Sequence, residues 1–180
     1  MSFPILTILA LLPLIGGAIV LGVKGRSGRA TGLVISIVTA VLGVIAFIAA
    51  ANGTDVSENY HWIKAIGAWY ALSSDGLGMT LVLMTVILVP VVLLAEWNIG
   101  EKKPSDGTQT WGANVFSGLA LMTEGLAIYC FTAVDVLFFY LIFEASLVPM
   151  YFLIGGFGNG PHRASAAVKF LLYNLFGGLI

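Results

Sequence analysis

Charged residues are scarce in this chain. Only 9% of its 180 residues are Asp, Glu, Lys or Arg and 59% are hydrophobic, whereas a soluble domain carries about 25% charged residues. There is too little polar surface to coat a soluble globule, which excludes a free-standing soluble enzyme domain. The net charge of −1 is spread over short clusters between apolar runs, so nothing indicates a surface for nucleic acid.

Cysteine and histidine are nearly absent as well. Cys130 is the single cysteine, which excludes an internal disulfide and any multi-cysteine metal or iron–sulfur site within this chain. His61 and His162 lie in polar connecting segments, whereas a membrane cytochrome needs axial haem ligands inside its helices. The glycine-rich turn at 155–160, GGFGNG, misses the dinucleotide-binding spacing. We therefore expect no cofactor bound by this chain.

Long apolar runs dominate the sequence instead. A hydrocarbon core about 30 Å thick takes roughly 20 helical residues to cross, and each backbone amide in lipid must be satisfied within its own segment. The pattern predicts an all-α, polytopic transmembrane bundle of five full spans and a truncated sixth. The runs are 3–23, 33–51, 77–95, 112–132, 134–155 and 164–180.

Basic residues gather on one side of these runs. Lys64 alone lies on the opposite side, and the others between or beside the runs are Lys24, Arg26, Arg29, Lys102, Lys103 and Arg163. The positive-inside rule then places the N-terminus outside the cytoplasm. Because the first run has basic residues after it and none before it, we expect a retained helix and not a cleavable signal peptide.

The outer connection at 52–75 is rich in amphipathic rings. Trp62, Trp69 and Tyr70 favour the membrane interface. We expect a partly ordered interfacial segment, and the alternative is a plain solvated loop.

The last run stops at Ile180 without a polar flank. A helix ending in mid-membrane would leave carbonyl groups unsatisfied. We therefore expect this chain to be the front part of a longer polypeptide, or to be completed by a partner.

Three ionisable residues interrupt the apolar runs: Glu124, Glu144 and Lys169. A charged group at a helix centre costs about 2.5–3.5 kcal/mol on insertion scales, so such residues usually face protein or water and mark ion or proton paths. Burial favours the neutral form of an acid or an amine, whereas pairing favours the charged form. The three residues are predicted to be successive stations of a proton relay, provided that their helices are adjacent and water fills the gaps.

Glu144 lies near the middle of its run, about 15 Å from either end. Tyr140 at i−4 and Tyr151 at i+7 share its helix face and can hydrogen-bond to it. Pro149 cannot donate to the carbonyl of Ala145, so a kink is expected just after Glu144. The alternative is that Glu144 is a protonated acid that joins two helices.

Lys169 belongs to a polar stripe with Ser165 at i−4 and Tyr173 at i+4. The alternative for Lys169 is snorkelling to the headgroups. Glu124 is expected nearer the outer side, because its run leads from inside to outside. Asp135, at the start of the fifth run, is predicted to be a helix cap and not a proton site.

Three stretches resemble one known family. Residues 133–158 read AVDVLFFYLIFEASLVPMYFLIGGFG, and residues 166–179 read AAVKFLLYNLFGGL. Both are similar to the M subunit of NADH-quinone oxidoreductase, respiratory complex I, where a glutamate precedes LxPMYFLI, a glycine-rich turn and a KFxLYT helix. Residues 69–84, WYALSSDGLGMTLVLM, resemble the entry into that family's third helix. Asn174 departs from the family, which usually has threonine there.

The resemblance implies an antiporter-like subunit whose complete form has about fourteen helices and two inverted repeats. Residues 1–110 would hold helices 1–3 with the outer segment, and 111–180 would begin the antiporter-like repeat. Glu144 would be the fifth-helix glutamate that couples redox energy to proton movement, with Lys169 and Glu124 in the same half-channel. The seventh-helix lysine that pairs with this glutamate would lie beyond the given sequence.

The resemblance also implies a subunit of an H⁺-translocating NADH:ubiquinone or NADH:menaquinone oxidoreductase. FMN, iron–sulfur clusters, NADH and quinone would be handled by other subunits. The partners would be other membrane-arm subunits, including antiporter-like neighbours, and lipids, in a bacterial plasma membrane or, as the alternative, an organellar inner membrane. Two other functions stay open: a subunit of a cation/proton antiporter or membrane-bound hydrogenase, and a purely structural anchor.

Overall fold

The chain folds into a helical bundle with one small sheet. The structure is a computed structural model, and it describes residues 4–23, 26–64, 67–99, 111–158 and 160–179. The elements in chain order are α1 (Ile5–Gly22), α2 (Arg26–Ala51), β1 (Glu58–Ile63), β2 (Ala68–Leu72), α3 (Gly76–Ala95), α4 (Ala113–Thr132), α5 (Val136–Phe157) and α6 (Arg163–Leu179). Within those ranges, five helices are long and apolar enough to cross a membrane, and α6 follows. The expected polytopic bundle is confirmed.

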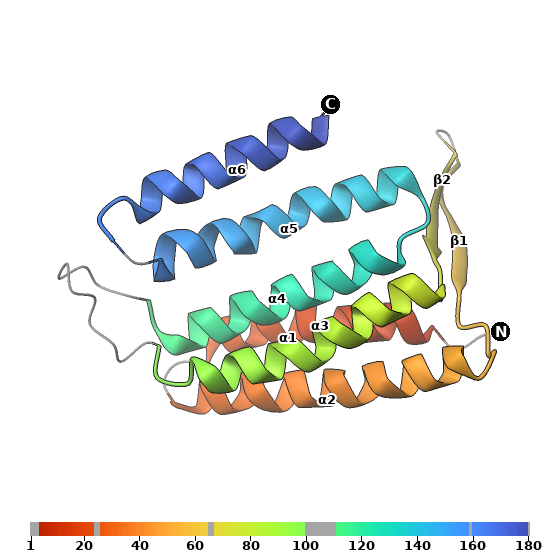
Figure 1. The fold of residues 1–180 in the computed structure, drawn as a ribbon, viewed down its shortest axis with the longest axis horizontal. Coiled ribbons are helices and arrows are strands. Elements are labelled where there is room, and N and C mark those ends of the chain that lie inside the picture. The colour runs from red at the N-terminus through yellow and green to blue at the C-terminus, as the bar shows by residue number, and fades with distance from the viewer. Residues whose placement is uncertain (1–3, 24–25, 65–66, 100–110, 159, 180) are drawn as a thin grey trace.

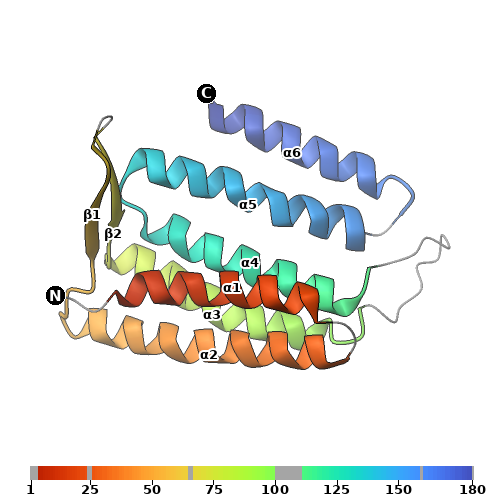
Figure 2. The same cartoon turned by 180° about the vertical axis from the view of Figure 1, so that it is seen from behind.

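The helices are arranged in layers (Figures 1 and 2). The helices α1 to α4 pack together, α5 lies against α4, and α6 lies against α5 as the outermost layer. The strands β1 and β2 stand at the end of the bundle where α1, α3 and α5 begin (Figure 1). We call this the hairpin end, and the opposite end the loop end. This order places α5, with its glutamate, between the two helices that carry the other predicted relay residues.

The helix α2 begins earlier than hydropathy predicts. The apolar run indicated a start at residue 33, but α2 begins at Arg26. Its first turns read RSGRATG. Hydropathy alone excludes these polar residues from the span, but the segment contains no proline that would break a helix. The Arg29 guanidinium donates to the Trp97 carbonyl oxygen at 2.9 Å. The added turns therefore extend α2 beyond its apolar part and are joined to the turn that follows α3.

Glycine lets α1 and α4 approach closely. A Cβ placed on Gly125 would lie 2.5 Å from the Ala10 carbonyl oxygen, and one on Gly17 would lie 2.6 Å from the Gly118 carbonyl oxygen. Backbones that come this near to each other are typical of membrane helices, where small residues replace the hydrophobic effect as the basis of packing. These contacts run along the most extensive helix pair of the bundle.

The connection between α2 and α3 contains two paired strands, β1 and β2, which corrects the expectation of an all-α chain. Antiparallel pairing joins Tyr60 to Tyr70 and His61 to Trp69, with an irregularity after His61. The residues of β1 and β2 are mostly aromatic or aliphatic, and such side chains favour strands. The strand structure of this segment was not predicted, and its place at the membrane interface stays a prediction.

The hairpin is attached to the turn between α4 and α5. The Val134 amide donates to the Ala71 carbonyl oxygen at 3.0 Å, and the Ser73 amide donates to the Thr132 carbonyl oxygen at 2.7 Å. Asp135 is the N-cap of α5, as the sequence predicts, and its carboxylate accepts from the Phe138 amide at 3.0 Å and the Trp69 amide at 3.1 Å. One carboxylate therefore holds both α5 and β2.

The hold of Asp135 on β2 is expected to weaken in acid. Hydrogen bonds from the amides of Phe138 and Trp69 lower the pKa of Asp135. Because the folded pKa is lowered, the carboxylate contributes stability above its ordinary pKa of about 3.9, and that contribution is lost as the pH falls through the folded value. Hydrogen exchange, corrected for intrinsic rate, should show the Trp69 amide losing protection below about pH 4. An Asp135→Ala variant should already lack this protection at neutral pH, and an equal acid response in both proteins would contradict the assignment.

Candidate functional site

Glu144 lies inside α5, nearer the hairpin end than the sequence predicted. It is eight residues from Val136 (144 − 136) and thirteen from Phe157 (157 − 144), which corresponds to about 12 Å and about 20 Å along the helix. The shift arises because α5 starts two residues later and ends two residues later than the apolar run 134–155. A carboxyl at this depth still needs polar or protein surroundings.

The Glu144 carboxyl meets Tyr140 and α6. The Tyr140 hydroxyl, one helical turn before Glu144, lies near enough to the carboxyl to interact with it electrostatically, as the i−4 spacing predicts. The Oε1 atom of Glu144 is buried and has no hydrogen-bond partner among the described residues. A Cβ on Gly178 would lie 3.4 Å from that oxygen. One buried acceptor of Glu144 therefore faces the end of α6.

An open cavity of about 380 Å³ lies between α5 and α6, and Gly178 in its lining is also next to the Glu144 carboxyl. Polar groups of both helices line it together with aromatic rings: Phe139, Tyr140, Phe143, Tyr173, Asn174, Gly177 and Gly178. Tyr173, predicted as a member of the stripe with Lys169, is 78% exposed and reaches this cavity. The structure thus brings Tyr140 and Tyr173 to one site.

The other two supporting residues of α5 are placed differently. Pro149 is buried within α5, which continues through it to Phe157, and the kink that it predicts stays a prediction. Tyr151 packs its ring on Phe152, and no hydrogen bond joins it to Glu144 in the described part of the chain. Spacing at i+7 put both groups on one face, but two helical turns separate them by about 10 Å along the axis.

Lys169 and Ser165 are exposed on α6. No hydrogen bond or ion pair joins Lys169, Glu144 and Glu124 to one another among the residues that the structure describes. Their helices are adjacent in the order α4, α5, α6, so one condition set for the relay is met. A relay through these groups therefore needs intervening hydrogen-bonding groups between the stations.

Glu124 is the most enclosed of the three. It is 1% exposed, and neither carboxyl oxygen has a hydrogen-bond partner within the described ranges. Its helix, α4, is surrounded by α1, α2, α3 and α5. A buried carboxylate without a partner is strongly unfavourable, so this position suits a group that takes up a proton.

A buried acid at the hairpin end was missed by sequence reasoning. Glu58 is 2% exposed, and its carboxylate accepts from the Leu6 amide at 2.8 Å, the Thr7 amide at 3.1 Å and the Thr7 hydroxyl. It therefore caps the beginning of α1, where unpaired amides and the helix dipole favour a negative group. The signal lay in β1, where an acid begins a strand that contains Tyr60 and Trp62.

The cap belongs to a chain of hydroxyl groups. The Thr7 hydroxyl also contacts the Tyr70 hydroxyl, which donates to the Tyr129 hydroxyl at 3.4 Å. Burial raises the pKa of Tyr70, which keeps this hydroxyl a donor. The network joins the hairpin to α1 and α4, and it is separate from the cavity beside Glu144.

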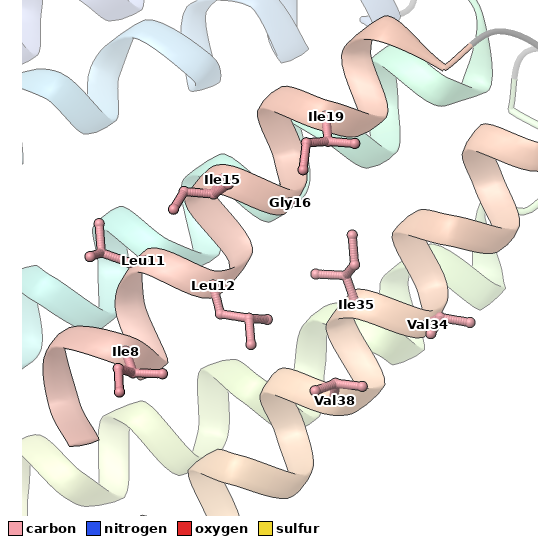
Figure 3. Close-up of a pocket in the computed structure, with 9 residues that line it drawn as sticks. All are labelled: Ile8, Leu11, Leu12, Ile15, Gly16, Ile19, Val34, Ile35 and Val38. Carbon is pink, nitrogen blue, oxygen red and sulfur yellow. The ribbon is translucent and has the colours of Figure 1, made fainter. Parts of the chain in front are cut away.

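An apolar groove of about 550 Å³ runs between α1 and α2. Figure 3 shows its lining, with Leu12 of α1 and Ile35 of α2 extending into the space between the helices. Gly16 is its one residue without an aliphatic side chain. The described residues that line the groove include no titratable group.

The chain is similar to known membrane subunits. The family model described as NADH:quinone oxidoreductase/Mrp antiporter, TM, matches residues 133–180. NADH-quinone oxidoreductase subunit M of Mycobacterium tuberculosis is 38% identical, over 99% of this chain and 37% of that protein. F(420)H(2) dehydrogenase subunit M of Methanosarcina mazei is 30% identical, over 98% of this chain and 34% of that protein.

A solved structure shows the same fold. A chain in respiratory complex I from Thermus thermophilus with bound NADH matches with a TM-score of 0.78 and 28% identity, covering 97% of this chain and 33% of that one. This chain spans about a third of the length of the relatives it matches. The resemblance drawn from residues 133–158 is thereby confirmed. The chain is a homologue of subunit M of NADH-quinone oxidoreductase, and it corresponds to about a third of the length of that subunit.

Proposed function

We propose that this chain acts in a proton-translocating membrane arm, where it couples NADH oxidation and quinone reduction to proton movement. The observation that carries the proposal is the Glu144 carboxyl inside α5, which has a buried oxygen without a hydrogen-bond partner among the described residues. It lies within residues 133–180, the part that matches the antiporter family model. Ionisable side chains inside membrane helices commonly mark ion or proton paths, which supports a proton role for this acid.

Glu144 is the central station in this proposal, and Lys169 and Glu124 are its neighbours on either side. The order of α4, α5 and α6 supports this sequence of stations. Water or residues of the complete subunit would bridge the distances, and a basic group from the remaining length of the subunit would pair with Glu144. Residues 111–180 would then form the start of the antiporter-like repeat, and residues 1–110 the helices before it.

The surroundings of the chain follow from the same proposal. Other subunits would hold FMN and the iron–sulfur clusters and would bind NADH and quinone, and antiporter-like neighbours would be direct partners. The basic segments at the loop end would lie in the cytoplasm of a bacterial cell, and the hairpin outside it. The apolar groove between α1 and α2, lined by aliphatic side chains, suits the acyl chains of lipids.

Glu144→Gln tests the proposal in the complete complex. Glutamine keeps the size and the acceptor oxygen but cannot release a proton, so NADH-driven proton movement into sealed vesicles should fall at least about tenfold, equivalent to about 1.4 kcal/mol on the coupled step. Coupled quinone reduction should fall with it, while the amount of assembled complex stays unchanged. Tyr151→Phe is the matched control on the same helix, and it should pump normally.

Two outcomes would reject this reading. Normal pumping by Glu144→Gln would remove the proton role of the residue, and loss of assembly without any separate loss of pumping would favour a structural anchor.

A cation/proton antiporter is the second candidate, because the matching family model includes Mrp antiporters. It predicts sodium-dependent or potassium-dependent proton flux without any NADH supply. The subunits that co-purify with the chain distinguish the two: flavin and iron–sulfur proteins favour the respiratory complex, and their absence favours the antiporter.

A further inference from the structure

Glu124 belongs to a polar stripe of α4 that faces α2. Ser117 and Glu124 are seven residues apart, almost two full turns, and their exposed fractions are 6% and 1%. A Cβ on Gly32 of α2 would lie 2.9 Å from Ser117 Cβ, so the two helices touch at this level. Both helices begin at the loop end (Figure 1), so seven further residues along each one place Thr39 at the level of Glu124. Thr39 is fully buried, and it shares one polar core with the carboxyl.

The hydroxyl groups of this core have no hydrogen left for Glu124. The Thr39, Ser117 and Ser36 hydroxyls donate to carbonyl oxygens of their own helices at 3.0, 3.0 and 2.9 Å. A hydroxyl has a single hydrogen, so each of these groups presents only lone pairs to its other neighbours. An ionised carboxyl would face acceptors, whereas a protonated one has acceptors toward which its hydrogen can turn.

The helices around Glu124 bring no positive charge near it. Within their described ranges, α1, α3, α4 and α5 contain no basic residue. In α2 the basic residues lie in the first turn, and Arg29 is ten residues (39 − 29) before Thr39, about 15 Å along the helix. The ionised groups that α5 can add are the acids Asp135 and Glu144. An unpaired carboxylate in such an interior is strongly unfavourable, so Glu124 needs a bound cation.

The packing around Glu124 admits a proton and no larger cation. Both carboxyl oxygens are buried, and no water-sized space adjoins either one. Gly125, the next residue of α4, brings the α1 backbone against this part of the helix. A hard metal cation needs several oxygen ligands in direct contact, and it would have to displace side chains to reach them. A proton binds to the carboxyl oxygen itself and needs no such space.

We propose that Glu124 is an occluded, proton-selective site. It holds a proton in the core between α2 and α4, excludes sodium and potassium ions, and exchanges its proton only when these helices separate. The inference rests on the proposed function, in which Glu124 is one station of proton movement, and it names the ion that this station takes. Thr39 is a positioning residue, because its side chain fills the core at the level of the carboxyl and keeps water out.

The infrared carboxyl band of Glu124 in the complete complex tests the site. This band is the one that the unmodified complex shows and Glu124→Gln lacks. We expect the frequency of a protonated acid, and we expect the band to keep it long after transfer into D₂O, because exchange of a buried hydrogen requires local opening. Turnover with NADH should speed the exchange several-fold. Sodium chloride and potassium chloride should leave the band as choline chloride leaves it at equal concentration.

Substitution of Thr39 separates occlusion from the fold. Thr39→Ala removes two heavy atoms beside the carboxyl and gives water a place in a polar core, so the Glu124 band should exchange several-fold faster in the resting complex. Thr39→Ser removes one methyl group and should act in the same direction to a smaller extent, which leaves a result if the alanine variant fails to assemble. Thr85→Ala is the matched control, because the hydroxyl of this half-buried residue of α3 also donates within its own helix, at 2.9 Å. It should leave the exchange unchanged.

The outcomes are separate from those of the proposed function. A missing protonated band, loss of the band on addition of sodium or potassium, or exchange at rest that is as fast as in Thr39→Ala would overturn the inference. Slow exchange that NADH does not accelerate would overturn the opening of the site and leave a structural acid. Normal pumping by Glu144→Gln, together with an occluded Glu124 band that responds to NADH, would reject the proposed role of Glu144 and keep this site.

Discussion

Gly125→Leu is expected to prevent stable incorporation of this chain into a membrane complex. The position that its Cβ would take lies 2.5 Å from the Ala10 carbonyl oxygen and 2.7 Å from Leu14 Cγ. The first of these atoms belongs to the backbone and cannot move aside as a side chain can. Helices α1 and α4 would have to separate over much of their contact, and in a membrane no hydrophobic gain from water offsets the lost packing. Overpacking of this kind typically costs about 1–3 kcal/mol or more.

The amount of folded chain in detergent after mild heating measures this loss. Gly22→Leu is the matched control, because it adds the same side chain near the end of α1, where nothing lies within 4 Å of the new Cβ. We expect the control to behave like the unmodified chain and Gly125→Leu to be largely lost. Equal recovery of the two variants would contradict the close α1–α4 packing.

Glu58→Ala is expected to release the beginning of α1. The carboxylate accepts three hydrogen bonds, two from backbone amides and one from the Thr7 hydroxyl. Alanine would leave those donors unpaired where Leu6 is fully buried, and each buried donor left unsatisfied costs about 1–3 kcal/mol. The substitution would also remove one link from the hairpin to α1, while the contact between the Thr7 and Tyr70 hydroxyls remains. We expect a loss of stability that exceeds an ordinary helix cap, which contributes about 1 kcal/mol.

Hydrogen exchange at the amides of Leu6 and Thr7 measures the release directly. Glu58→Gln keeps an acceptor oxygen and should retain part of the protection, whereas Glu58→Ala should lose nearly all of it. Asn59→Ala, at the exposed neighbouring position, should change nothing. Protection that survives in Glu58→Ala would show that other groups cap α1.

Periodicity and hydropathy predict the helices of this chain, because each span must carry its apolar length and satisfy its own amides. They fail where polar residues continue a helix, as at Arg26 in α2. They also fail for the hairpin, whose strands are short and whose pairing of residues 58–63 with 68–72 depends on contacts that no single segment encodes. Strand preference of this kind depends strongly on context.

The candidate site was predictable one residue at a time and not as an assembly. The free-energy cost of placing an ionisable group in the membrane singles out Glu124, Glu144 and Lys169. Such residues are rare in apolar runs and usually serve a function. The Tyr140 contact follows from helical spacing. The closeness of Gly178 to the Glu144 carboxyl does not, because it depends on how α6 packs on α5, and the cap at Glu58 depends on the hairpin folding back over α1.

The central claim is that the Glu144 carboxyl changes its protonation state during turnover. Infrared difference spectroscopy of the complete complex, with and without NADH, tests it most directly. The account predicts a protonated-carboxyl band that changes in intensity when NADH is added and that is absent from Glu144→Gln. A difference spectrum that is identical in the unmodified complex and in Glu144→Gln would contradict the account.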